Sequence, residues 1–208
     1  EPYRVQVLCP IKAGAAGASN LNRRLQRKLN ESGGAFVESE GCRYITGDKV
    51  MHITNNYNLG WRRIVGGTHE TGEGVFNGDL GVIAEIRPDS GEIDVLYEDG
   101  RLVTYTPDVR NQLMPAYAIT VHKSQGSEFD GVIVPLYGLN PVIMTRNLLY
   151  TAITRAKRAV VLVGERYTIK RMVENDYVAL RYSALKKFLG EAFVLDSLLF
   201  GSDEEDDE

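Results

Sequence analysis

The stretch AITVHKSQGSEFDGVIVPL, residues 118–136, decides how this chain is organised. Two apolar runs of strand length flank a polar loop, which carries Thr120, His122, Lys123, Ser124 and Gln125. Ligands of α/β sheets bind in loops at the carboxyl ends of parallel strands. The loop's hydroxyl, imidazole, ammonium and amide groups suit phosphate oxygens, and Gly126 lets a backbone N–H approach one closely. Taken singly, His122 is better explained as a core histidine and Lys123 as a solvated surface charge, so the prediction of a phosphate-binding loop comes from the whole stretch.

The beginning of the chain also has the sequence pattern of an α/β unit, a strand followed by a helix. Residues 5–8 form a short apolar run, and a loop of small residues leads into a helix whose N-cap is Ser19 or Asn20. Leucines spaced four apart give that helix one apolar stripe, formed by Leu21, Leu25 and Leu29. Its more exposed faces are expected to carry Asn22, Arg23, Gln26 and Arg27.

The later part of the chain supplies the partners that this first piece lacks. Besides the two strands of the opening stretch, it contains a helix near residues 145–153 and a third apolar strand, AVVLVG, at 159–164. A strand and helix at 1–45 cannot bury their apolar face alone, whereas the two pieces together make a sheet of ordinary size. We therefore predict one parallel α/β domain from residues 1–45 and 114–195, with one or two terminal helices after Arg166 that cover the sheet.

Between these two pieces, residues 46–113 have a different sequence pattern. Short alternating strands such as DLGVIAEI and EIDVLY are separated by strong turns of Pro/Asp/Ser/Gly and Asp-Gly type. This pattern predicts a small antiparallel barrel or sandwich inserted into the α/β domain. Within it, residues 61–74 (WRRIVGGTHETGEG) are rich in Gly and Thr and show no periodicity, so we expect a long, mobile excursion from a hairpin.

Composition excludes several classes of protein. Hydrophobic residues make up 43% and charged residues 25% of the 208 residues, which is an ordinary globular balance. Two cysteines, Cys9 and Cys42, and three scattered histidines provide neither a disulfide framework nor zinc-ligand spacing, so we expect a reduced, metal-free protein. No apolar run approaches the ~20 residues that cross a bilayer. No signal peptide begins the chain, which favours a soluble, cytoplasmic protein without a membrane partner.

The net charge of −4 hides a division within the chain. The closing string SDEEDDE is almost wholly acidic, and the body that precedes it is therefore slightly basic. Such a string is too charged to bury, so we expect residues 196–208 to form a disordered acidic tail. A near-neutral body can still hold a local basic patch. At its other end the chain opens almost directly on an apolar strand without an initiator methionine, and we expect a fragment of a longer protein.

A second polar junction lies in LLYTAITRAKRAVVLVG, residues 148–164, between a helix and a strand. Three of its cations fall within four residues, and a solvated face explains Lys157 and Arg158 as readily as a binding site does. Arg155 differs from them, because it follows an apolar helical stretch that should hold it in place, Leu149, Ala152 and Ile153. A guanidinium held in this way can lie at the edge of a cleft, as a phosphate-binding arginine must.

Together, the two junctions resemble motifs V and VI of superfamily I helicases, specifically the C-terminal motor domain of the RecD-type, exodeoxyribonuclease V alpha-subunit-like DNA helicases. The pair VHKSQGSEF and YTAITRAKR is highly specific. The string CPIKAGAAGASNLNRRLQ is similar to motif IV of that family, and NNY at 55–57 and VFNGDLGVI at 75–83 are similar to its SH3-like insertion. The resemblance covers nearly all of the chain before the terminal helices, the 61–74 excursion being a departure from it. It implies a RecA-like motor domain interrupted by a small SH3-like antiparallel β-barrel.

The resemblance also implies roles for residues of the polar loop. Thr120 and His122, with Lys123 beside them, would contact the backbone of single-stranded DNA. Gly126 and Glu128 would line the edge of the nucleotide, with Glu128 near the ribose. The DNA contacts and the nucleotide contacts would then lie only a few residues apart.

Two arginines complete the implied site. Arg155 would be the arginine finger that reaches the γ-phosphate of ATP, and Arg23 of NRRLQ would match a motif IV arginine that faces the same phosphate. Arg24 is adjacent, however, and for either arginine alone a helix-surface charge is the more common explanation.

The chain carries only half of such a site. It contains no G-x-x-x-x-G-K-[ST] string, and no apolar strand ends in an Asp-Glu pair that could hold Mg²⁺. The family therefore implies that ATP and Mg²⁺ are bound mainly by another motor domain upstream of Glu1, and that this fragment alone is inactive. It also implies movement from 5′ to 3′ on single-stranded DNA and DNA-repair subunits as possible partners. Two alternatives stay open, the helicase-like part of a conjugative relaxase and a non-motor nucleic-acid-binding module, and the upstream sequence would distinguish them.

Overall fold

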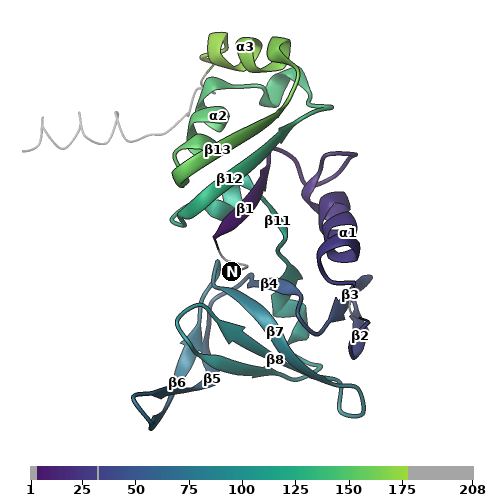
Figure 1. Cartoon of the computed structure of the whole chain (residues 1–208), viewed down its shortest axis with the longest axis vertical. Helices are drawn as coiled ribbons and strands as arrows, with labels where there is room; N and C mark the ends of the chain where they lie inside the picture. Colours follow the sequence, from purple (N-terminus) through teal and green to yellow (C-terminus); the bar gives the residue numbers. More distant parts are fainter. Residues whose placement is uncertain (1–3, 32, 178–208) are drawn as a thin grey trace, which may run out of the picture. The chain divides into compact units, whose positions relative to one another are not determined.

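The computed structural model describes residues 4–31 and 33–177, and the elements below belong to one compact unit that ends at Asp176 (Figure 1). That unit contains a four-stranded sheet, a seven-stranded sheet and a two-stranded hairpin. Whatever terminal helices follow residue 177, and the expected acidic tail at 196–208, lie outside the described residues. Within the described ranges, no helix is long and apolar enough to cross a membrane.

The four-stranded sheet is parallel and brings together distant parts of the sequence. In order across the sheet, its strands are β11 (Ala118–Thr120), β1 (Val5–Cys9), β12 (Phe129–Leu136) and β13 (Ala156–Gly164). β1 lies between two strands that come much later in the chain, so that Val7 is opposite Ala118 on one side and Ile133 on the other. This confirms the prediction that the first strand and the segment after residue 114 form one α/β domain.

Helices pack on both faces of this sheet. Because successive side chains of a strand point to opposite faces, Leu8 and Cys9 of β1 belong to different cores. Leu8 shares a core with Leu149 of α2 (Arg146–Ile153) and Met172 of α3 (Arg166–Glu174). Cys9 shares another core with Ala18, Leu21 and Leu25 of α1 (Ala18–Leu29). Leu29, the last member of the predicted apolar stripe, is 68% exposed and does not take part.

The N-terminus of α1 differs from the prediction. Its N-cap is Gly17 and not Ser19 or Asn20, and no side chain caps the helix. A Cβ atom at position 17 would lie 2.4 Å from the Ala13 carbonyl oxygen, so only glycine allows the preceding loop to fold against the helix start. The Asn20 side chain donates instead to the Ala15 carbonyl oxygen, at 2.8 Å.

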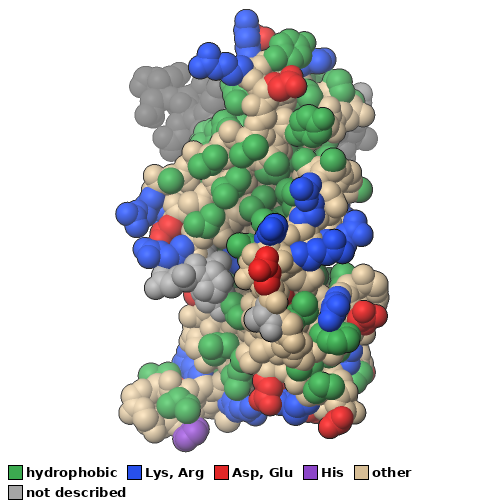
Figure 2. All heavy atoms as spheres, turned by 45° about the vertical axis from the view of Figure 1, so that its right-hand side comes forward, with side chains coloured by type: hydrophobic (Ala, Val, Ile, Leu, Met, Phe, Trp, Pro, Cys, Tyr) green, Lys and Arg blue, Asp and Glu red, His purple; other side chains and the backbone are tan. Residues whose placement is uncertain are grey.

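Described residues leave part of the α1 side of the parallel sheet uncovered. Val5, Val161 and Val163 point to that side, and each is 52% exposed. Figure 2 shows apolar side chains (green) gathered over the upper part of the molecule in that view. Contiguous apolar surfaces of this kind are usually places where further chain or a partner packs.

The seven-stranded sheet is antiparallel and corresponds to the predicted β insertion. Its order is β10-β4-β7-β8-β9-β5-β6, and the strands are β4 (Lys49–His52), β5 (Asn56–Val65), β6 (Thr68–Val75), β7 (Leu80–Arg87), β8 (Glu92–Tyr97), β9 (Leu102–Tyr105) and β10 (Leu113–Pro115). Alternate residues of these strands fill one core, which includes Ile83, Ile93 and Val103. In the same core the Tyr105 hydroxyl lies 2.8 Å from Nδ1 of the fully buried His52.

A hairpin of β2 (Phe36–Ser39) and β3 (Cys42–Ile45) precedes this sheet and packs against it. Val37 and Tyr44 enter the core of the insertion, and the Tyr44 hydroxyl donates to the Leu113 carbonyl oxygen at 2.8 Å. The sequence suggested an insertion at 46–113, and from these contacts we propose that it extends over residues 36–115.

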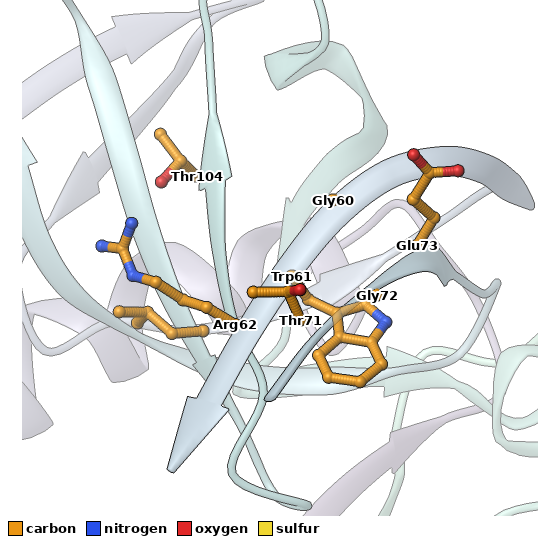
Figure 3. Close-up of a pocket in the computed structure, with 8 residues that line it drawn as sticks. Gly60, Trp61, Arg62, Thr71, Gly72, Glu73 and Thr104 are labelled. Atoms are coloured by element: carbon orange, nitrogen blue, oxygen red, sulfur yellow. The ribbon is translucent and has the colours of Figure 1, made fainter. Parts of the chain in front are cut away.

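Residues 61–74 are not an irregular excursion, and that prediction is wrong. They belong to the paired strands β5 and β6, with Trp61 opposite Gly72 and Val65 opposite Thr68. Figure 3 shows Trp61 beside Gly72, where a Cβ atom would lie only 2.5 Å from the indole ring. Most side chains of this hairpin are at least partly exposed on both faces, so its sequence lacks the apolar alternation from which a strand is predicted.

Candidate nucleotide and nucleic-acid interface

The polar loop begins at the end of β11. Thr120 closes the strand and is half-buried, and a 3₁₀ turn over residues 121–124 follows it. Val121 is buried in the core, and Ser124 Oγ donates to the Val121 carbonyl oxygen at 2.7 Å. These two residues hold the turn and leave His122 and Lys123 exposed to solvent. His122 is therefore not a core histidine.

The loop turns back toward the sheet at Gly126. Its φ of 86° lies in the left-handed region that favours glycine, and the Ser127 N–H donates to the Ser124 carbonyl oxygen at 3.0 Å. No atom lies within 4 Å of the place that a Cβ would occupy. The backbone conformation alone therefore requires glycine, and the surface at this point is open to a ligand.

α2 holds Arg155 at the start of β13. The helix begins where it was predicted, because the Thr145 side chain accepts a hydrogen bond from the Leu148 N–H at 3.3 Å. Leu149 and Ala152 are buried, as expected for residues that hold the arginine. Ile153 does not help them, because it is 36% exposed.

Two hydrogen bonds join Arg155 to the polar loop. The Phe129 N–H donates to the Arg155 carbonyl oxygen at 2.8 Å, and Arg155 Nη1 donates to the Ser127 carbonyl oxygen at 3.3 Å. The Nε atom of Arg155 is buried and has no hydrogen-bond partner among the described residues. A half-buried guanidinium with an unpaired donor is suited to an acceptor that a ligand supplies.

Glu128 lies next to Arg155 in this arrangement. Its carboxylate is 3.4 Å from Lys157 Nζ, and both side chains are more than half exposed. An exposed ion pair of this kind contributes little stability, so either group can turn to a ligand at low cost. The structure thus brings together three of the predicted nucleotide contacts, Gly126, Glu128 and Arg155.

Arg23 lies elsewhere, in a groove of about 1020 Å³. Thr120 and Lys123 also line this groove, whereas His122, Gly126 and Arg155 do not. Its walls come from α1, the β2–β3 hairpin and the segment that includes β10. The structure therefore groups Arg23 with two of the predicted DNA contacts and not with the predicted nucleotide contacts.

Asn22 was expected on an exposed face of α1 but is buried. Its side-chain amide donates to the Ala118 carbonyl oxygen at 2.7 Å and accepts from the Ala118 N–H at 2.8 Å. This pair of hydrogen bonds fixes α1 against β11, directly before Thr120.

A buried carboxylate, Asp48, was not predicted at all. It is 1% exposed and accepts hydrogen bonds from the Gln26 and Asn30 side chains, the Ile45 N–H and the Tyr117 hydroxyl. Asp48 therefore ties α1 to the insertion and to the segment that enters β11. The signal in the sequence is a stripe of amides, because Asn22, Gln26 and Asn30 follow one another every four residues.

The described residues offer few other reactive groups. They contain no cluster of three or more His, Cys, Asp and Glu side chains that could hold a metal ion. Both cysteines are free thiols, and burial raises the pKa of Cys9 to about 12.

Comparison with protein families agrees with this geometry. Residues 115–163 match the UvrD-like helicase C-terminal domain, and residues 21–97 match the SH3 domain of ATP-dependent RecD-like DNA helicases. The chain is 34% identical over 156 residues to the ATP-dependent RecD2 DNA helicase of Deinococcus radiodurans, covering 75% of this chain and 19% of that protein. It is 33% identical over 189 residues to the RecBCD enzyme subunit RecD of Mycolicibacterium smegmatis, covering 91% of this chain and 30% of that protein. The chain thus spans less than a third of either relative.

Solved structures show the same fold. A structure of two coordinating Pif1 helicases at forked double-stranded DNA aligns with 93% of this chain and 45% of the Pif1 chain, with a TM-score of 0.52 and 21% identity. Bacteroides Pif1 bound to single-stranded DNA aligns with 93% of this chain and 46% of its own, with a TM-score of 0.51 and 20% identity. Both likenesses concern the RecA-like sheet with its β insertion. The chain therefore belongs to the RecD-type DNA helicases of superfamily I and carries their C-terminal motor domain with its SH3-like insertion.

Proposed function

We propose that the full-length protein is an ATP-dependent DNA helicase that moves from 5′ to 3′, and that this region is its second motor domain. The observation that carries the proposal is the path of a single loop. Residues 120–128 begin at the groove lined by Thr120 and Lys123 and end beside Arg155. A shift at the nucleotide end of so short a loop reaches the DNA end without an intermediate element.

On the DNA side, the exposed donors of the loop bind the strand. Thr120 and Lys123 face the groove, and His122 is exposed on the same turn. Hydroxyl, ammonium and imidazole groups bind phosphate oxygens without reading the bases. We assign Arg23 to this side as well, because it lines the groove with Thr120 and Lys123.

On the nucleotide side, Arg155 is the arginine finger. The residues here fit the phosphate end of a nucleotide, because the guanidinium is held at Ser127 while its buried Nε lacks a protein partner among the described residues. Bound ATP supplies the free energy for movement. Arg155 stabilises the negative charge that develops on the γ-phosphate, while Gly126 and Glu128 border the nucleotide. We assign no described residue to Mg²⁺, since the described part of the chain has no cluster of metal ligands.

This half-site works only against the other motor domain of the same chain. The P-loop and the magnesium carboxylates then belong to that domain, and this region alone is expected to be inactive in ATP hydrolysis. Because one relative is a subunit of the RecBCD enzyme, DNA-repair subunits are the partners we propose for the full-length protein.

The test uses the full-length protein and two duplexes that differ in the polarity of a single-stranded tail. We expect ATPase activity that single-stranded DNA stimulates, together with unwinding of the duplex with the 5′ tail. Unwinding of only the 3′-tailed duplex would refute the polarity. Absence of both DNA-stimulated ATPase and unwinding would refute the motor function.

A further inference from the structure

Most of the charged side chains that line the groove between α1 and the β2–β3 hairpin are cations. Five of them face it, Lys12, Arg23, Arg27, Arg43 and Lys123, against two carboxylates, Glu31 and Glu40. Within the described ranges, none of the five forms a salt bridge. All five are exposed, and Figure 2 shows Lys and Arg side chains (blue) on the side of the molecule that carries α1. Unpaired cations in a concave surface raise the local concentration of anions.

These cations come from four separate parts of the chain, and Lys12 lies in the loop between β1 and α1. Arg23 and Arg27 lie one turn apart on α1, Arg43 lies on β3, and Lys123 lies in the polar loop. At about 1020 Å³ the groove is much larger than one phosphate group needs. A row of phosphates on a flexible chain fits such an arrangement better than a single small anion does.

Arg43 is placed to contact a phosphate. Its guanidinium carbon lies 3.9 Å from the centre of the Phe36 ring, so the aromatic face supports the plane of the guanidinium. Stacking of this kind leaves the N–H groups at the edge free for oxygen acceptors. Beside these donors the groove has an apolar part, Ile53, Leu113, Met114 and Pro115, which suits sugars and bases.

Asp48 fixes the width of the groove. Its carboxylate accepts from Asn30, the C-cap residue of α1, at 2.8 Å and from the Ile45 N–H of β3 at 2.8 Å, so the two walls are joined. The site is therefore formed before a ligand arrives, and a ligand need not order it.

We propose that this groove is a phosphate track for single-stranded DNA, in which Arg23, Arg27 and Arg43 extend the contacts that begin at Thr120 and Lys123. The proposal rests on the DNA-binding function proposed above and adds a wall from the insertion to it. The track is sequence-independent, because its charged donors meet the backbone.

The experiment measures binding of an unstructured oligothymidylate to the full-length protein, without nucleotide, at several salt concentrations. Each phosphate contact on a single strand contributes roughly 0.7 to the slope of log K against log salt. We expect the double variant R23Q/R27Q to reduce that slope by about 1.4 and Arg43→Gln to reduce it by about 0.7. Glutamine keeps a good helix propensity at positions 23 and 27, and Arg43 is exposed on its strand, so the variants should fold.

The matched control is R24Q/K28Q on the same helix. It removes the same charge from exposed residues that do not line the groove, and it should leave the slope nearly unchanged. If R23Q/R27Q and Arg43→Gln both behave like this control while the wild type remains a DNA-stimulated ATPase, the track is overturned and the helicase function stands. If the wild type itself neither binds the strand nor hydrolyses ATP, the helicase function fails first.

Discussion

Replacing Arg155 by alanine separates a structural role from a catalytic one. In the structure, the only side-chain hydrogen bond described for Arg155 is the 3.3 Å contact with the Ser127 carbonyl oxygen. Its loss should lower the free energy of unfolding by about 1 kcal/mol. An arginine finger contributes about 10³ to 10⁵ to turnover, which corresponds to about 4 to 7 kcal/mol of transition-state stabilisation. The two roles therefore predict effects of very different size.

The assay measures three quantities on folded, full-length Arg155→Ala: DNA-stimulated ATPase, nucleotide-free binding of single-stranded DNA, and the midpoint of urea unfolding. We expect ATPase to fall by about 10³ or more, with DNA binding within a few-fold, because Arg155 does not line the groove. Arg155→Lys should not restore activity, because a point charge cannot replace the guanidinium fork. Arg158→Ala is the matched control, since Arg158 is an exposed cation of β13 that lies three residues after Arg155. Near-normal ATPase in Arg155→Ala, or an equal loss of DNA binding and stability, would refute the arginine finger.

Three further predictions follow from buried groups. Asp48→Ala should lower the free energy of unfolding by about 3 kcal/mol or more, because each stranded donor costs about 1 to 3 kcal/mol; an unchanged midpoint of urea unfolding would contradict this. Burial lowers the pKa of His52 from 6.5, so the unfolded state takes up a proton before the folded state does. Stability should therefore fall as the pH drops below about 6.5, and less so in His52→Gln; unfolding curves at two pH values measure the difference. Iodoacetamide at mildly alkaline pH should label Cys42 long before Cys9, whose pKa is about 12; mass spectrometry after brief labelling would show the opposite order if Cys9 were accessible.

Periodic features of the sequence predicted much of this fold. The apolar runs around residue 120 and the first strand were expected to share a sheet, and Thr145 marks the start of α2. The errors at the start of α1 and in residues 61–74 come from contacts between residues that no local sequence pattern pairs. Gly17 caps α1 because of its distance from Ala13, and Trp61 packs over Gly72 across a solvent-exposed hairpin.

The sequence also suggested only part of the arrangement of the candidate site. Motif resemblance suggested both ends of the polar loop, and the structure gathers Gly126, Glu128 and Arg155 at one of them. It also suggested the nucleotide for Arg23, which stays a prediction, because spacing along a helix cannot say which groove a helix face borders. Which groove α1 borders depends on where the β2–β3 hairpin lies. Asp48 fixes the position of the hairpin through hydrogen bonds to Asn30 and to the Ile45 N–H.

β4 connects the insertion to the motor domain. Val50 of β4 lies in the core of the insertion, whereas the next residue, Met51, lies in the core of the motor domain with Leu8. The Lys49 carbonyl oxygen also accepts from the Ala116 N–H at 2.8 Å, just before β11. Because one strand serves two cores, the insertion cannot swing on a linker without exposing apolar side chains. We therefore expect the insertion and this motor domain to move together, and in the proposed helicase the change that drives translocation would occur between them and the other motor domain.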